Sequence, residues 1–331
     1  PTALMCSFSP ISPHPPRLWL APLRGLTDAE FRTAFARHFQ GIDLAIAPFV
    51  TTHGGHRIKS THVRDLLPAK NRDMVVIPQI LSKHPDDFSR LANHFFDMGY
   101  GCVNLNLGCP FPQVANKGRG SGMLPFPERI DAFLEAVIPR LAGRMSIKTR
   151  LGRHRPDEIQ HLIPVFNRFP LQEIIIHPRT GVQMYTGRPD EAAFASCLRA
   201  LAPPVIYNGD ITCLSDFNRL AARFAGVSGW MIGRGVLANP FLPGSLKNGR
   251  EDREDNAARF HRFHDDLLER YGRRLHGPGH LLNRMKGFWN YFANGFQGGA
   301  RARKRIHRSR TLGQYQEAVR VFFGSGYDWV G

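Results

Sequence analysis

The chain has 331 residues, 42% of them hydrophobic, enough for one large core with a smaller appendage or for two domains. Its 44 lysines and arginines exceed its 27 aspartates and glutamates, and the formal net charge of +17 favours polyanionic partners, nucleic acid before an anionic membrane. No apolar run approaches the ~20 residues of a membrane span. The five cysteines lack CxxC spacing, which argues against a disulfide framework or a structural zinc site and fits a reducing, cytoplasmic compartment.

The first 16 residues lack the charged start and apolar middle of a signal peptide, and we expect a disordered leader there. From residue 17 to 247, short β-rich runs alternate with amphipathic helical ones. The expected strands are 18–22, 43–49, 75–81, 103–108, 145–151, 173–179, 204–210 and 229–235. Expected helices include 27–39, 86–99 and 127–141, with apolar residues at helical spacing, such as Phe88, Leu91, Ala92 and Phe95.

Eight strands, several apolar on both faces and separated by helices, predict a parallel sheet with crossover helices. The count favours an α/β fold of the (β/α)8 TIM-barrel type over an open doubly wound sheet. Residues 50–74 are the weakest part of this pattern and are typical of an irregular insertion.

After residue 247 only helical patterns remain, at 256–272, 280–296 and 312–324, and these predict a small helical bundle over 248–331. Between Glu269 and Glu317 there is no acidic residue, whereas eleven arginines and lysines occur, most densely in 301–310. A solvated helix face normally mixes both signs, so this segment favours nucleic-acid binding.

Polar side chains gather where the predicted strands end, which is where TIM barrels carry their active sites. The residues at these ends are Gln79, Asn106, Cys109, Lys148, Arg150, His177, Arg179, Asn208, Asp210 and Arg234. A purely structural interior would leave such positions apolar or small. Their number therefore predicts one site at the carboxyl end of the barrel.

Glycine-containing turns follow the last two predicted strands, in "YNGD" and "IGRG". Such turns expose backbone N–H groups that commonly bind a phosphate in barrels, although ordinary tight turns are the alternative. Lys148 and Arg150 share one face of the fifth strand and require an anion or an electron-rich ring, such as a reduced flavin. Gln79 and Asn106 offer polar contacts to that ring, and a salt bridge to Asp210 or Glu173 is the competing explanation for Lys148.

Cys109 lies in "NLGCP" and is followed by glycines at 118, 120 and 122. A thiol with a pKa near ~8.5 is mostly protonated at neutral pH and suits a general acid opposite a hydride donor. The glycines would let the loop move. A nucleophilic cysteine, for which no His–Asp pair is evident, and a buried structural thiol are the alternatives.

Three histidines, His53, His56 and His62, lie in the predicted insertion without a cysteine or carboxylate among them. They favour an RNA-facing or incidental role over a zinc site, and no metal is expected.

The ordered motifs resemble those of the tRNA-dihydrouridine synthases, and the fold region with its short C-terminal bundle is most similar to the bacterial C-type branch. The first strand, "LAPLRGLTD", is similar to the family's "APMxGxTD", and "NLNLGCPFPQVANKGRGSGML" is similar to its "NxGCPxxxVxxxxxGaxLL" signature with Cys109 at the catalytic position. "SIKTRLG", "IIHPRTGVQMYTG", "VIYNGDI", "MIGRGVLANPFL" and "NRMKGFWNYF" match further family segments in order. Phe111 and Pro112 depart from the usual small polar residue after "GCP".

This resemblance implies an FMN-binding barrel that reduces particular tRNA uridines to 5,6-dihydrouridine with electrons from NADPH. Hydride would pass from the reduced flavin to uracil C6, and Cys109 would protonate C5. The implied cofactor contacts are Pro22, Gln79, Lys148, His177, Asn208, Gly209, Asp210, Gly233 and Arg234. The uracil and tRNA contacts are Asn106, Arg150, Arg179, Arg284, Lys286, Arg301, Arg303, Lys304 and Arg305, and a monomer is expected.

Two other functions stay open at this point. A flavin barrel acting on a free pyrimidine, similar to dihydroorotate dehydrogenase, explains the turns and Lys148 but not the basic bundle. A non-catalytic RNA-binding barrel predicts a missing acid or missing flavin contacts, whereas Cys109, Lys148 and both turns are present.

Overall fold

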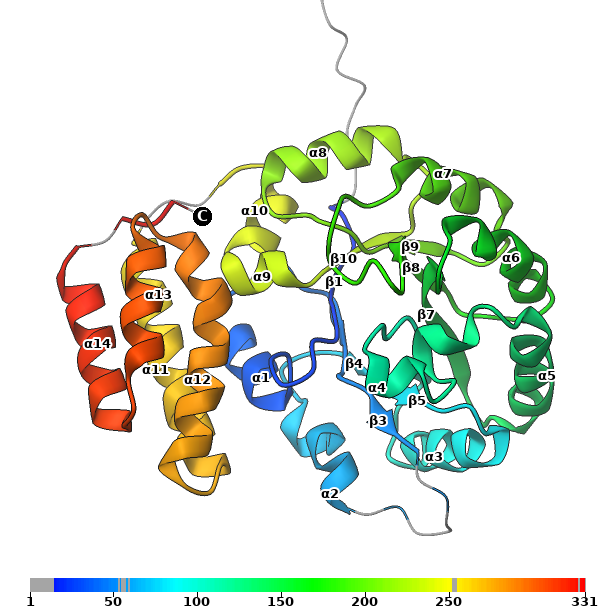
Figure 1. Cartoon of the computed structure of the whole chain (residues 1–331), viewed down its shortest axis with the longest axis horizontal. Coiled ribbons are helices and arrows are strands. Elements are labelled where there is room, and N and C mark those ends of the chain that lie inside the picture. The colour runs from blue at the N-terminus through cyan, green and yellow to red at the C-terminus, as the bar shows by residue number, and fades with distance from the viewer. Residues whose placement is uncertain are drawn as a thin grey trace, which may run out of the picture.

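The computed structural model describes residues 15–52, 54, 58, 60–251, 255–326 and 328–330. Ten parallel strands curl into a barrel with helices around it (Figure 1). The strands are β1 (Leu18–Leu20), β2 (Leu44–Ile46), β3 (Val50–Thr51), β4 (Val76–Ile77), β5 (Gln79–Leu81), β6 (Cys102–Leu107), β7 (Arg144–Gly152), β8 (Ile174–Thr180), β9 (Val205–Tyr207) and β10 (Gly229–Ile232). The TIM-barrel prediction is confirmed.

The ten strands occupy eight positions, because two of the predicted strands are each interrupted at a proline. Pro48 separates β2 from β3, and Pro78 separates β4 from β5, since proline has no N–H for the ladder. β2 pairs with β4, β3 pairs with β5, and β5 also pairs with β6 on its other side. At the other side β1 pairs with both β10 and β2, so the pairing returns to its start.

Helices follow the strands and cover the outside of the barrel (Figure 1). They are α1 (Ala29–His38), α2 (Ser60–Val63), α3 (Pro85–Asp97), α4 (Pro112–Ala115), α5 (Pro127–Val137), α6 (Ile159–Asn167), α7 (Glu191–Ala200), α8 (Leu214–Arg223), α9 (Arg234–Ala238) and α10 (Leu242–Asn248). In the described part of the insertion between β3 and β4, α2 and two short 3-10 turns are the helical elements, in line with the irregular segment expected there. His53 and His56 lie outside the described residues.

Side chains on each strand alternate between the helices and the barrel interior. In β6, Val103, Leu105 and Leu107 join the large core under the helices, and the residues between them point inward. The interior is apolar on the side of β1, β2, β8, β9 and β10, where six side chains pack together. These are Trp19, Ala21, Ile46, Ile175, Ile206 and Met231.

Four further helices, one more than the three expected, form a bundle at one side of the barrel (Figure 1). They are α11 (Asn256–Arg274), α12 (Pro278–Phe292), α13 (Gly299–Arg308) and α14 (Leu312–Gly324). Phe31 of α1 stacks on Phe288 of α12 at 5.8 Å between ring centroids and meets Phe263 of α11 edge-on at 5.9 Å. The Tyr271 hydroxyl donates to Asp28 Oδ1 across the same junction at 2.5 Å. The barrel and the bundle therefore share one packed interface, and their division near residue 247 stays a prediction.

Within the described residues, no helix is both long and apolar enough to span a membrane. The expected leader lies almost wholly outside the described part of the chain.

Candidate active site

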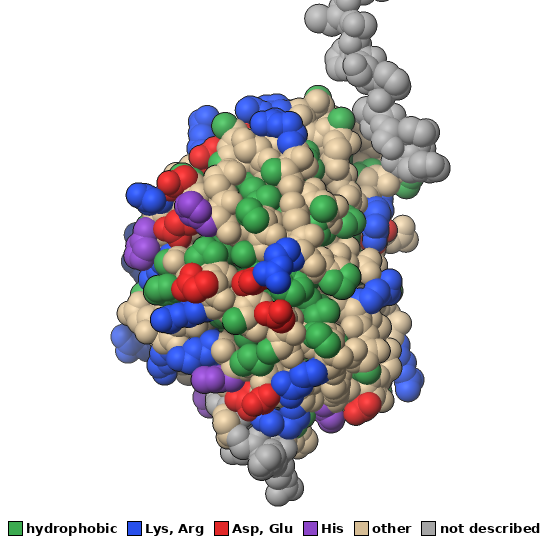
Figure 2. All heavy atoms as spheres, turned by 90° about the vertical axis from the view of Figure 1, so that its right-hand side faces the viewer, with side chains coloured by type: hydrophobic (Ala, Val, Ile, Leu, Met, Phe, Trp, Pro, Cys, Tyr) green, Lys and Arg blue, Asp and Glu red, His purple; other side chains and the backbone are tan. Residues whose placement is uncertain are grey.

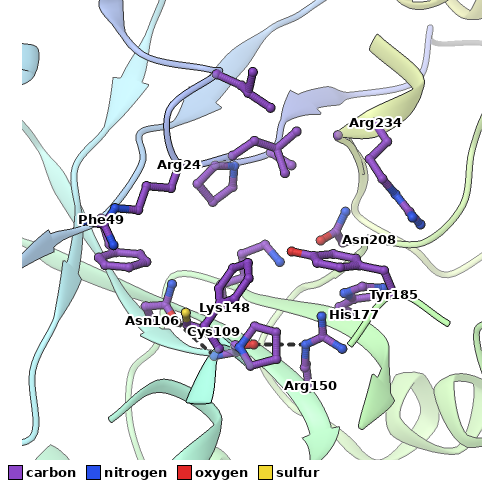
Figure 3. Close-up of a pocket in the computed structure, with 18 of the residues that line it drawn as sticks. Arg24, Phe49, Asn106, Cys109, Lys148, Arg150, His177, Tyr185, Asn208 and Arg234 are labelled. Atoms are coloured by element: carbon purple, nitrogen blue, oxygen red, sulfur yellow. Dashed lines mark hydrogen bonds between the residues drawn. The ribbon is translucent and has the colours of Figure 1, made fainter. Parts of the chain in front are cut away.

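A cavity of about 580 Å³ opens at the carboxyl ends of the strands (Figure 3). Its size is typical of sites for small ligands and cofactors. Most of the residues expected at the site line it, namely Pro22, Asn106, Cys109, Lys148, Arg150, His177, Asn208, Gly209, Asp210, Gly233 and Arg234. Asn290 and Tyr291 of α12 also line it, so the bundle completes one wall.

Cys109 lies on the loop after β6, and its backbone is fixed from two sides. The amides of Gly108 and Cys109 donate to Asn106 Oδ1 at 3.1 and 2.8 Å, and the Cys109 carbonyl accepts from the Ser121 amide at 3.1 Å. Gly120 packs on this turn with φ +56°, and a Cβ there would lie 2.9 Å from Cys109 Cβ. The glycine-rich loop therefore covers the cysteine closely, and its movement stays a prediction.

The thiol of Cys109 is held in its protonated form. Burial raises its pKa above the ordinary value, although the Phe111 backbone N–H and three nearby cations act in the opposite direction. The side chain is only 7% exposed, yet it lines the cavity. A protonated thiol at a cavity wall can donate a proton to a bound substrate.

Lys148 is a half-buried side chain that lines the cavity. No hydrogen bond or ion pair to Lys148 occurs among the described residues, so the alternative of a salt bridge to Asp210 or Glu173 is not found. Burial and, to a smaller extent, the neighbouring Arg150 lower the pKa of Lys148 to about 7. An unpaired buried ammonium is costly, and an anionic or electron-rich ligand beside it would relieve that cost.

Arg150 is engaged by the backbone of the surrounding loops. Its guanidinium donates to the carbonyls of Gly108 at 3.0 Å, Thr180 at 2.8 Å and Met184 at 2.7 Å. Met184 has φ +50°, which is unusual for a residue with a side chain. Arg150 thus ties the cysteine loop to the loop after β8.

Asp210 joins the buried Arg179 to Arg234 in an ion-pair network at the cavity wall. Arg179 is 1% exposed, does not line the cavity and pairs with Asp210 at 2.6 Å, while Arg234 contacts the other Asp210 oxygen at 2.6 Å. Burial opposes ionisation of Asp210, but its bonds to the two arginines outweigh that and hold the pKa below the usual range. Asp210 is therefore an anion that fixes two cations.

His177 is neutral in this setting. Burial and the surrounding cations hold its pKa well below the ordinary value. Arg179 donates to Nε2 at 3.0 Å, which leaves the ring proton on Nδ1.

The two glycine turns run so close to neighbouring side chains that a Cβ would be crowded at either position. A Cβ on Gly209 would lie 2.2 Å from the Tyr207 hydroxyl oxygen, and one on Gly233 would lie 3.2 Å from Ala21 Cβ. Asn208 is fixed beside them by donating to the Met231 carbonyl at 2.9 Å. Together with Arg234 and Lys148, these residues fit a ligand with a phosphate and an electron-rich ring.

Gln79 lies below the cavity rather than in its wall. It is fully buried, and its amide bonds with Asn104 and Asn106. Its contact with a cofactor stays a prediction.

Four aromatic residues of the wall were missed by the sequence reasoning, namely Phe49, Phe111, Tyr185 and Tyr291. Tyr185 lies under the guanidinium groups of Arg150 and Arg234, at 5.4 and 5.1 Å from its ring centroid. The family-like segment "GVQMYTG" was the available signal for Tyr185. Arg24, which lies 5.8 Å above the Phe49 ring, was also missed.

The six basic residues expected to contact tRNA divide into two groups. Arg301, Arg303, Lys304 and Arg305 are exposed on α13. Arg284 donates to the Gly25 carbonyl, and Lys286 donates to the Ser309 carbonyl. The α13 group is free to meet a polyanion, whereas Arg284 connects the bundle to the barrel.

The face of the barrel away from the bundle has a different charge pattern. Figure 2 shows acidic and basic side chains interspersed there. No group of three or more potential metal-ligating side chains occurs within the described part of the chain.

The model of the dihydrouridine synthase family matches residues 19–323. A probable tRNA-dihydrouridine synthase of Staphylococcus epidermidis is 27% identical over 313 residues, which cover 92% of each chain. One of Rhodobacter capsulatus is 28% identical over 271 residues, covering 78% of this chain and 82% of the relative. Among solved structures, an old yellow enzyme homologue from Zymomonas mobilis aligns with a TM-score of 0.53 and 13% identity, covering 72% of this chain and 91% of the other.

Proposed function

The chain belongs to the dihydrouridine synthase family, and from this premise we propose that Cys109 is the general acid of its reaction. Family membership makes it a flavin-dependent, NAD(P)H-dependent oxidoreductase that reduces uridines in tRNA to dihydrouridine. Within that activity we assign FMN as the bound flavin and NADPH as the electron donor. The observation that carries the assignment of Cys109 is its protonated thiol at the wall of a cavity that also holds Lys148.

The residues of the cavity suit FMN in two ways. Gly209 and Gly233 line the cavity beside Arg234, where backbone N–H groups suit a terminal phosphate, and Lys148 offers a positive charge to the ring edge. When bound and reduced, the flavin supplies a hydride for C6 of the uracil. Cys109 then donates its proton to C5, and the thiolate that forms is stabilised by nearby cations and the Phe111 N–H.

The uracil reaches this cavity only if the nucleotide leaves its stack. Aromatic side chains at the wall offer faces for a flat base, and the neutral His177 ring and Asn106 offer polar contacts. Since Arg150 and Arg179 are engaged by backbone carbonyls and by Asp210, we assign them to holding the loops that surround the base.

The test of the reaction is dihydrouridine mapping in tRNA from cells that lack the gene. Complementation with the wild-type chain should restore dihydrouridine, and Cys109→Ala should leave reduction at least about 100-fold slower, as expected for loss of a general acid. Cys109→Ala should retain yellow flavin and tRNA binding. Cys213→Ala, a half-buried cysteine at the start of α8, is the matched control. Wild-type turnover by Cys109→Ala would refute the acid assignment, and reduction of free uridine as fast as tRNA would indicate a small-molecule enzyme.

We assign tRNA binding to the basic α13 surface, meaning Arg301, Arg303, Lys304 and Arg305. Replacing all four by alanine should weaken tRNA binding about 10- to 100-fold and lower the salt dependence by roughly three to four counterions. Arg140→Ala with Arg168→Ala, at residues paired with Asp86 and Asp131, is the control. Equal losses in both proteins would contradict a localised surface.

The other assignments concern the setting of the enzyme. We propose that it acts as a monomer in the cytoplasm, where its substrate is found, and light scattering of the purified protein tests the first point. The position of the reduced uridine follows from the same mapping, and the resemblance to the C-type branch predicts one near the start of the D-loop.

A further inference from the structure

A row of buried amide side chains runs down the inside of the barrel beneath Cys109. Asn106 Nδ2 donates to Gln79 Oε1 at 2.8 Å, Gln79 Nε2 donates to Asn104 Oδ1 at 2.7 Å, and Asn104 Nδ2 donates to Ser146 Oγ at 2.8 Å. Asn104, Gln79 and Ser146 are 0% exposed. We call these four residues the amide ladder.

Only one orientation of the three amide groups satisfies every hydrogen bond of the ladder, and the backbone around Cys109 determines which one. The amides of Gly108 and Cys109 can only donate, so they require the oxygen of Asn106. The nitrogen of Asn106 must then face the oxygen of Gln79, and each later rung follows. A flip at one rung would bring two oxygens or two nitrogens together, so the orientation of each amide depends on its neighbours.

The strands explain why the ladder is continuous. Asn104 and Asn106 are two residues apart on β6 and therefore point to the same side. Gln79 on β5 and Ser146 on β7 are both in register with Asn104, on either side of it. The ladder thus spans three adjacent strands and is closed from solvent.

From this arrangement we propose that Asn104 is a positioning residue for Cys109. It touches neither the cavity nor the cysteine, and it acts by holding Gln79, which orients Asn106, whose oxygen fixes the Gly108–Cys109 turn. The inference rests on the proposed function for its meaning, since it concerns the acid of that reaction. The geometry of the turn can nevertheless be measured without tRNA.

The first variant is Asn104→Leu, which keeps a similar volume and removes both hydrogen-bonding groups. Gln79 loses its acceptor, Asn106 is no longer oriented, and the turn loosens. We expect iodoacetamide to alkylate Cys109 about 5- to 10-fold faster, followed peptide by peptide by mass spectrometry. Turnover on tRNA should fall about 10- to 100-fold at unchanged KM, because small displacements of a reacting group cost rate. Flavin reduction by NADPH should not change.

The second variant, Asn104→Asp, separates orientation from simple packing. One carboxyl oxygen still accepts from Gln79, and the other can accept from the Ser146 hydroxyl or, when protonated, donate to it. Alkylation and turnover should therefore stay within about threefold of wild type. Cys102→Ala is the control at the far end, because its sulfur donates to Ser146 Oγ at 4.0 Å and bonds to none of the three amide side chains.

The outcomes decide the proposal. Wild-type alkylation of Cys109 in a folded Asn104→Leu protein would overturn it, and so would equal defects in Asn104→Leu and Asn104→Asp. If Asn104→Leu does not fold, Asn104→Ser replaces it, with faster alkylation again expected. Alkylation of the wild-type chain does not need tRNA reduction, so failure of the ladder and failure of the proposed function are distinguishable.

Discussion

The two halves of the barrel interior are filled by different kinds of side chain. Under the glycine turns, the side of β1, β8, β9 and β10 is filled by apolar side chains that pack by shape alone. Under Cys109, the side of β5 to β7 is filled by the amide ladder. The first half supports turns that present backbone rather than side chains to the cavity, for which packing suffices. The second half supports Cys109, whose side chain must be oriented for its reaction. Hydrogen bonds are directional, so they can fix that orientation.

The largest expected effect concerns Lys148, which lies where the polar half of the interior meets the cavity. Lys148→Met should lower turnover on tRNA about 10²- to 10³-fold, because one preorganised charge is lost. Since Lys148 has a pKa of about 7, it is charged below that pH and neutral above it. Wild-type affinity for flavin should therefore fall as the pH rises through 7, and that of Lys148→Met should not, as followed by fluorescence titration of the apoprotein. A wild-type affinity that is constant between pH 6 and 8 would argue against contact between Lys148 and an anionic edge.

A smaller effect tests the apolar half. Ile175→Ala should lower the free energy of unfolding by about 2–4 kcal/mol through the cavity it leaves, and Ile175→Val by about 1 kcal/mol. Neither should change the alkylation rate of Cys109, measured on the folded protein. Faster alkylation in Ile175→Ala would break the comparison, because it would show that volume alone positions the cysteine.

The smallest effect concerns Glu173, a 5% exposed carboxyl just before β8. Burial raises its pKa from 4.5 to about 7, so the folded state holds its proton more tightly than the unfolded state. Its contribution to stability is present below pH 4.5 and is lost as the pH rises through 7. The free energy of unfolding of Glu173→Gln should therefore rise relative to wild type as the pH goes from 5 to 8. The gain should reach about 1–3 kcal/mol, measured by urea unfolding. A constant difference across that range would contradict the burial argument.

Much of the barrel was predictable, because strands apolar on both faces and helices with a 3.6-residue period leave clear patterns. The two interruptions at Pro48 and Pro78 were not expected, since apolar runs continue through both prolines. The pattern "VNLNLG" predicted a strand, but alternation alone does not tell whether its asparagines face a ligand or one another.

The candidate site was predictable as a set of strand ends, while the engagement of each side chain was not. The expected place of Arg179 near the uracil stays a prediction, while its bonds to Asp210 and to the carbonyls of Thr186 and Gly187 were not foreseen. Such pairing depends on loops that approach from other strands. Tyr185 was missed for the same reason, because its place over the cavity depends on the Arg150 bond to Met184.

The contribution of Asn290 and Tyr291 to the cavity wall has a consequence for how this protein can be altered. A bundle exchanged between relatives would bring its own two wall residues, so a graft designed to change which tRNA is recognised would also reshape the space around the reacting base. The bundle and the cavity wall are therefore inherited together through one helix, α12. Engineers who want to retarget such an enzyme should transplant the surface of α13 and keep α12.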